Sequence, residues 1–95
     1  MPAASRKGDL TAGHACFPPT AIIGSCSKIY INGILASKLG VGVASHRCGK
    51  TTHAGRTVTG GSSTVFFENA RATRIGDSVN CGDTIGQGSK NVIIG

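Results

Sequence analysis

Short apolar runs recur along the chain and are separated by turn-forming residues. Residues 29–31, 65–67 and 92–94 are three such runs, and each is rich in the β-branched or aromatic side chains typical of strands. No segment carries the 3.6-residue apolar stripe of an amphipathic helix between capping residues. The pattern therefore predicts an all-β chain built from short strands.

Turn residues follow the first two runs directly. Asn32-Gly33 is the strongest short hairpin signal, because a type I′ turn needs positive φ at both central residues. Glu68-Asn69 occupies the same place after the second run, although glutamate resists positive φ. We expect a hairpin at each of these turns.

The two hairpins belong to one repeated unit. Residues 27–40 align with residues 63–76, each with a strand, a turn, a second strand and a closing glycine. Residues 88–95 match the opening strand of this unit and residues 3–9 match its closing half, so the two chain ends supply a third copy if they pair. A lone hairpin is marginal in water, whereas three can bury their apolar faces around one axis. We therefore expect residues 1–95 to form a single domain of three pseudo-equivalent hairpins.

A residue able to bind metal follows each closing glycine of the repeat at almost the same distance. It lies six positions after the first two glycines and five after the third, which gives His14, His46 and Cys81. Equivalent positions in three copies around one axis approach that axis at one level, so these side chains should converge. Two imidazoles and a thiolate need one more ligand for the tetrahedral site that structural Zn²⁺ prefers.

The fourth ligand is open among three residues. His53, in the loop after the second histidine, is the natural candidate. Cys16 and Cys48 are the alternatives, because each lies two positions after a candidate histidine, on the same face if the chain is extended. A zinc ion with four protein ligands has no open position for water, so the site would be structural. A small β protein with histidines and cysteines but no metal is the simpler alternative.

Cysteine usage favours a reducing compartment. The first nine residues lack the apolar stretch of a secretory signal, so we expect reduced thiols rather than disulfides. Cys26 stands where the second repeat has Ser62, and we expect it to be structural.

The charge of the chain is basic but scattered. Ten Lys and Arg against four Asp and Glu give a net charge of +6, without a run of five or a basic helix. Aromatic residues make up 4 %, too few for a surface on which bases stack. We therefore expect no nucleic-acid partner, and an acidic protein partner or a solvated surface instead. No apolar run reaches the 18 residues of a membrane-spanning helix.

Catalytic motifs are not found in the sequence. Gly49-Lys50-Thr51 resembles the end of a phosphate-binding loop, but Ala44 stands where that loop requires glycine, and no helical pattern follows. No nucleophile elbow is present, and only four carboxylates are available. We expect that the protein is not an enzyme.

The repeats resemble the PAAR-repeat family, small proteins that cap the spikes of contractile injection machines. The strand signature of the family is matched by residues 27–33, 61–66 and 88–95, and the resemblance covers the whole chain. Val41 departs from it, since the family usually has Asp after the repeat glycine. The naming motif occurs in degenerate form as Pro2-Ala3-Ala4-Ser5-Arg6, Leu35-Ala36-Ser37-Lys38 and Arg71-Ala72-Thr73-Arg74.

This resemblance implies a fold and a metal site. The expected fold is a cone of short strands with pseudo-threefold symmetry and one structural zinc ion near the apex, bound by three histidines and one cysteine. Carried onto this sequence, the ligands are His14, His46, His53 and Cys81.

It also implies a partner and a place of action. The protein would cap a trimeric β-helical spike, either VgrG in type VI secretion or the central spike of a phage tail, with one copy per trimer. It would help to pierce the target membrane in a transient contact, with or without a non-covalent effector. We expect it in the bacterial cytoplasm before assembly, then at the tip of the spike or virion tail, and finally in the target cell. A free-standing zinc module that binds nucleic acid or protein is the alternative.

Overall fold

The computed structural model describes residues 2–14, 16–80 and 82–95. All regular elements of these residues are short strands, as predicted, and no helix occurs among them. The strands are β1 (Tyr30–Ile31), β2 (Ile34–Leu35), β3 (Gly42–Val43), β4 (His46–Cys48), β5 (Thr51–His53), β6 (Arg56–Thr57), β7 (Phe66–Phe67) and β8 (Ala70–Arg71).

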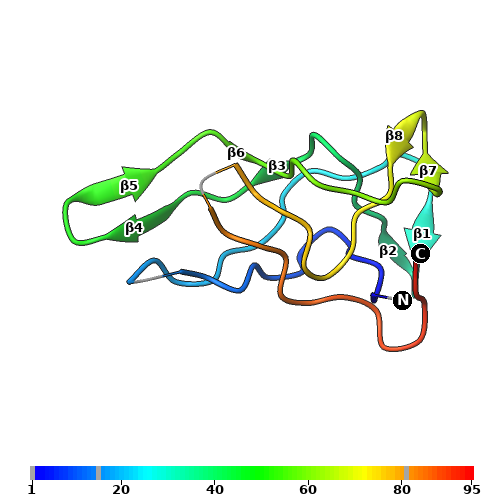
Figure 1. The fold of residues 1–95 in the computed structure, drawn as a ribbon, viewed down its shortest axis with the longest axis horizontal. Coiled ribbons are helices and arrows are strands. Elements are labelled where there is room, and N and C mark those ends of the chain that lie inside the picture. Colours follow the sequence, from blue (N-terminus) through cyan, green and yellow to red (C-terminus); the bar gives the residue numbers. More distant parts are fainter. Residues whose placement is uncertain (1, 15, 81) are drawn as a thin grey trace.

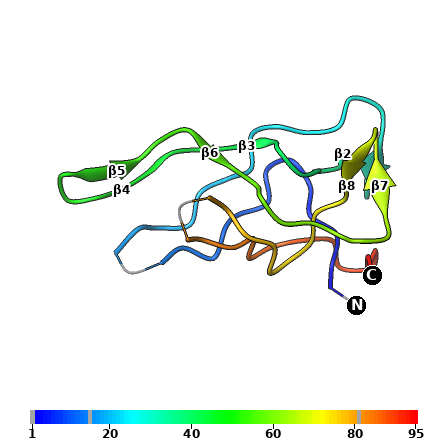
Figure 2. The ribbon, with the colours of Figure 1, turned by 45° about the horizontal axis from the view of Figure 1, so that its top comes forward.

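The strands form four antiparallel pairs along an elongated molecule of 37 × 24 × 21 Å. The pairs are β1–β2, β3–β6, β4–β5 and β7–β8. Hairpin β4–β5, here called the tip, projects at one end (Figures 1 and 2). Hairpins β1–β2 and β7–β8 together with residues 92–95, here called the base, lie at the other end. The molecule therefore narrows from the base to the tip.

Both expected hairpin turns are present at the base. Asn32 and Gly33 have φ values of 55° and 77° between β1 and β2. Glu68 and Asn69 have φ values of 51° and 67° between β7 and β8, so glutamate takes the left-handed conformation here. Positive φ at both central residues is the type I′ signature, and it matches the twist of the flanking strands.

The chain ends pair to make the third copy, as predicted. Ala3 and Ile93 form an antiparallel bridge. The backbone N–H of Ala4 donates to the carbonyl of Val92, and that of Ile94 donates to the carbonyl of Pro2, both at 2.9 Å. The N-terminal and C-terminal segments thus replace the hairpin that one continuous repeat would form.

The three copies meet at a narrow axis lined by small side chains. Ser5, Ser37 and Thr73 are fully buried and joined by their hydroxyls, with 2.7 Å between Ser5 and Thr73 and 2.8 Å between Thr73 and Ser37. The residue before each hydroxyl is a fully buried alanine. Antiparallel bridges connect the copies in cyclic order: Ala4 with Arg74, Arg6 with Ala36, and Lys38 with Ala72. Only small side chains fit where three segments of the chain come this close together.

Buried apolar side chains of the described residues form two clusters. The base cluster consists of Ala4, Cys26, Ile31, Ala36, Ala72 and Ile94. The second cluster, formed around β3 and β6, consists of Ile22, Val41, Val43, Val58, Val79 and Ile85. This second cluster fixes the strands that lead into the tip, and so it positions the residues described next.

Candidate metal centre

Three histidines converge where the tip joins the body of the molecule. His46 begins β4 and His53 ends β5, and the two residues are directly opposite each other in the hairpin register. His14 comes from a tight turn in which it exchanges two backbone hydrogen bonds with Phe17. One ring nitrogen from each histidine lies within 4.8 Å of the other two. The two histidines that the repeat spacing was expected to bring together, His14 and His46, therefore lie close to each other, and His53 lies with them.

The structure changes the setting of His53. We expected it in a loop, but residues 51–53 form β5. The turn of this hairpin begins at Gly49, whose φ of 59° is a conformation that glycine adopts without strain. Gly49 and Lys50 thus form the turn between β4 and β5. In the sequence they were compared only with a phosphate-binding loop, and this hairpin was not predicted.

The orientation of His46 leaves one nitrogen directed at the cluster. Its Nδ1 lies 3.2 Å from the carbonyl oxygen of Pro18, which can only accept a hydrogen bond, so Nδ1 carries the proton. Its Nε2 then presents a lone pair, 2.9 Å from Nδ1 of His53. Burial lowers the pKa of His46, and the positive charge of Arg56 lowers it further, which outweighs the Pro18 hydrogen bond. The ring is held neutral, as a metal ligand must be.

His14 supplies the observation that tests whether a metal fits. Its Nε2 is buried and has no hydrogen-bond partner among the described residues. A buried polar atom without a partner costs roughly 1–3 kcal/mol, so native structures rarely leave one unused. A metal ion bound by the three rings would give this nitrogen a partner, and imidazole nitrogens suit Zn²⁺.

The fourth expected ligand, Cys81, lies outside the described residues. Its neighbour Gly82 lies against His14, since a Cβ at this glycine would be 3.7 Å from the His14 Nδ1. Asp83 follows, with its Oδ2 at 4.0 Å from Nδ1 of His46. The chain on one side of position 81 therefore passes beside the histidines.

Phe17 covers the histidines and was not anticipated. Its ring stacks on His53 with centroids 4.0 Å apart, and it lies 4.6 Å from the ring of His46 and 5.1 Å from that of His14. An aromatic ring packed against all three imidazoles restricts their movement. No repeat position marks Phe17, so sequence spacing gave no signal for it.

A buried ion pair lies next to the cluster and was also missed. Arg56 and Asp83 are fully buried with 2.6 Å between Nη2 and Oδ2. Arg56 also donates to Thr20 Oγ1 and to the carbonyl of Ala44. Burial alone would raise the pKa of Asp83, but hydrogen bonds from Thr11 and from the Thr84 backbone, with the charge of Arg56, lower it. The pair stays ionised and anchors the chain on both sides of the histidines.

The cysteines differ from expectation. Cys16 and Cys48 are joined as a disulfide, with 5.4 Å between their Cα atoms, whereas we expected reduced thiols. This pairing occupies both alternatives to His53 as the fourth ligand. Their spacing from His14 and His46 put the two sulfurs on neighbouring segments, which is the geometry that a disulfide needs. Cys26 is free and buried in the base cluster, in line with a structural role.

A family model, described as the PAAR motif, matches residues 48–95, half of the chain. The chain belongs to the PAAR motif family. The matched half contains β5 with His53, hairpin β7–β8 and the C-terminal strand segment of the third copy. Among curated proteins none matches the chain.

PAAR proteins are structural spike-tip proteins of contractile injection systems, and membership implies association with a VgrG-type spike. The PAAR assignment agrees with the all-strand, tapering fold and with a histidine group able to hold a metal. The part of the chain that the structure describes contains no helix with the length and apolar character to cross a bilayer.

Proposed function

We propose that this PAAR protein is the metal-stabilised point that caps a trimeric β-helical spike and helps to pierce the target membrane. Residues 1–95 act as one non-catalytic domain, with one copy on each trimer. It is in the bacterial cytoplasm before assembly and then serves at the end of a VgrG spike or of a phage central spike. The observation that carries the proposal is a set of three matched apolar side chains at the base.

These side chains occupy the same repeat position and all face outward. Tyr30 is 63 % exposed, Phe66 57 % and Ile93 55 %. Their neighbours pack inward, with Ile31 and Ile94 buried in the base cluster. Large exposed apolar groups gathered on one end of a protein mark an interaction surface. Three of them in pseudo-threefold arrangement fit a partner that itself has three equivalent subunits.

We further propose Zn²⁺ as the metal, with His14, His46, His53 and Cys81 as ligands. The support is the unpartnered His14 Nε2 and the three convergent rings. The ion would crosslink separate chain segments and supply no reaction. The residues of this chain hold the rings: the Pro18 carbonyl fixes the tautomer of His46, and the Phe17 ring packs against His46 and His53.

Native mass spectrometry with the spike trimer of the same injection system tests the function. We expect one copy of this chain per trimer. The double variant Tyr30→Ser, Phe66→Ser should weaken the complex at least about tenfold, because a hot-spot side chain contributes roughly 2 kcal/mol or more.

The matched control is Ile23→Ser. Ile23 is as exposed as Phe66, at 57 %, but it pairs with Gly42 of β3 and lies away from the base. This variant should bind as the wild type does. Three copies per trimer, or no complex with the spike, would remove the spike-cap proposal.

A further inference from the structure

All four carboxylates of the chain are used in internal ion pairs. Asp9, Asp77 and Asp83 are buried, and Glu68 is half-buried. The pairs are Arg6 with Asp9 at 3.0 Å, Arg74 with Asp77 at 3.0 Å, Arg56 with Asp83 at 2.6 Å, and Lys38 with Glu68 at 3.2 Å. No carboxylate side chain of the described residues is therefore available to an outside cation.

The remaining six cations are all exposed and form no ion pair within the described residues. They are Lys7, Lys28, Arg47, Lys50, Arg71 and Lys90. Their number equals the formal net charge of +6. The whole net charge is therefore displayed on the surface, with no exposed acidic side chain to offset it.

Three of these six cations lie at the base. Arg71 is directly opposite Phe66 in hairpin β7–β8. The backbone N–H of Lys28 donates to Glu68 at the turn of that hairpin, at 3.0 Å.

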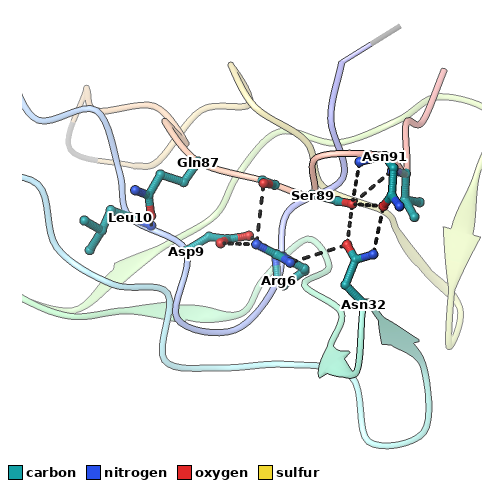
Figure 3. Close-up of polar contacts among 9 residues, drawn as sticks. Arg6, Asp9, Leu10, Asn32, Gln87, Ser89 and Asn91 are labelled. Atoms are coloured by element: carbon teal, nitrogen blue, oxygen red, sulfur yellow. Dashed lines mark hydrogen bonds and ion pairs between the residues drawn. The ribbon is translucent and has the colours of Figure 1, made fainter.

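Lys90 is the third base cation, and neighbouring hydrogen bonds fix its place. It stands between Ser89 and Asn91, and both of these hydrogen-bond Asn32 at the β1–β2 turn (Figure 3). The three cations are thus held near the same hairpins that carry the exposed apolar side chains.

We infer that the end of the spike which receives this base carries unpaired carboxylates around an apolar centre. This inference rests on the proposed function and names the chemistry of the partner. Interfaces commonly combine an apolar centre with a polar rim. Lys28, Arg71 and Lys90 form a rim in which the one acidic side chain, Glu68, is already paired with Lys38. Such a rim is complemented by acidic groups, and this complementarity mainly raises the association rate.

A protein partner fits this surface better than an anionic lipid surface does. The base cations accompany three apolar side chains at related positions, which is the layout of a specific threefold contact. The cations near the far end, Arg47 and Lys50, belong to the tip hairpin, which has no exposed large apolar side chain. Anionic lipid binding is therefore an outcome to be tested, not the inference.

The test is the association rate with the spike trimer, measured for neutralised variants at two salt concentrations. Lys28→Gln, Arg71→Gln and Lys90→Gln should each slow association about twofold, and together about tenfold, at about 0.1 M salt. The difference should vanish near about 1 M salt, where the Debye length falls to roughly 3 Å.

Lys50→Gln is the matched control, since it removes one exposed unpaired cation at the turn of the tip hairpin, away from the base. The molecule is 37 Å long, several Debye lengths of roughly 10 Å, so Lys50→Gln should associate at the wild-type rate. Circular dichroism and melting temperature would confirm that every variant is folded.

The outcomes separate this inference from the proposed function. If the triple variant associates at the wild-type rate while Tyr30→Ser, Phe66→Ser does not bind, the spike cap stands and the acidic rim is wrong. If the triple variant loses only binding to phosphatidylserine vesicles, the cations serve a lipid surface and the inference also fails. If the wild type does not bind the spike, the proposed function fails first.

Discussion

Glu68 compensates for two irregularities of the first repeat. Lys38 lacks the neighbouring aspartate that its counterparts have, because Val41 stands there, and Lys38 pairs instead with Glu68. Cys26 stands where the other copies have a buried serine. Ser62, for example, accepts the backbone N–H groups of the second and third residues after it. In the first repeat Glu68 accepts the N–H groups of Ser27 and Lys28, of which Lys28 is the second residue after Cys26, the position that binds the serine hydroxyl in the other copies.

Because of these hydrogen bonds, the stability of the folded protein depends on pH in the acidic range. The Ser27 and Lys28 backbone groups and the Lys38 ammonium lower the pKa of Glu68 from 4.5 to about 2, although burial opposes this. A lowered folded-state pKa stabilises the protein above the unfolded value, and this contribution is lost as the pH falls from 4.5 toward 2. We expect the melting temperature of the wild type to fall across this range, and that of Glu68→Gln to start lower and fall less.

A second substitution checks the compensation itself. Cys26→Ser supplies the acceptor that the other copies have, so it should restore part of the stability lost in Glu68→Gln. Thermal melts of both single variants and the double variant at neutral pH give the coupling free energy between positions 26 and 68. Purely additive effects would show that Glu68 does not act in place of a serine at position 26.

Among the elements, the tip hairpin is held to the body twice. The disulfide joins Cys16 to Cys48, 32 residues apart, and the proposed metal joins His14 to His46, which have the same separation. In the chain-entropy account, a crosslink across such a loop stabilises by about 3–4 kcal/mol. Because both links close the same loop, the second removes little further freedom from the unfolded chain.

Reduction of the disulfide should therefore lower the melting temperature slightly in the zinc-loaded protein and strongly in the metal-free protein. We expect a phosphine reductant to lower the melting temperature several times more after chelation than before it. Cys26→Ser serves as the background, so that the buried thiol of Cys26 takes no part in disulfide exchange. Equal shifts with and without metal would show that the two crosslinks act on different loops.

The base hairpins could be predicted from sequence and the tip hairpin could not. Asn32-Gly33 carries its own conformational requirement, so turn and register followed from local chemistry. Gly49-Lys50 gives a weaker signal, and β5 has no apolar run to mark it.

His14 and His46 were found through the spacing of the repeats, and His53 through its position in the chain after His46. The Arg56–Asp83 pair was not, because nothing local shows that distant charges will be buried together.

At the scale of the whole molecule, stability depends on how closely three chain segments approach one axis. Ala36→Val adds two methyl groups where three fully buried alanines meet, and overpacking of this kind costs about 1–3 kcal/mol. Ala70→Val is the control, since Ala70 lies at the edge of the base in β8 and is only half-buried. Urea unfolding should show a clear loss for the first variant and little for the second. Equal losses would mean that the axis is not tightly packed.

The placement of charge also bears on what happens before the protein meets its spike. The exposed apolar side chains of the base would favour association of two copies face to face. Lys28, Arg71 and Lys90 lie at that end, and each acidic side chain of the described residues is already paired within its own copy, so a second copy offers none to neutralise them. Mutual repulsion therefore opposes premature self-pairing. The charges that we propose to match an acidic trimer would also keep the protein monomeric before it is assembled on the spike.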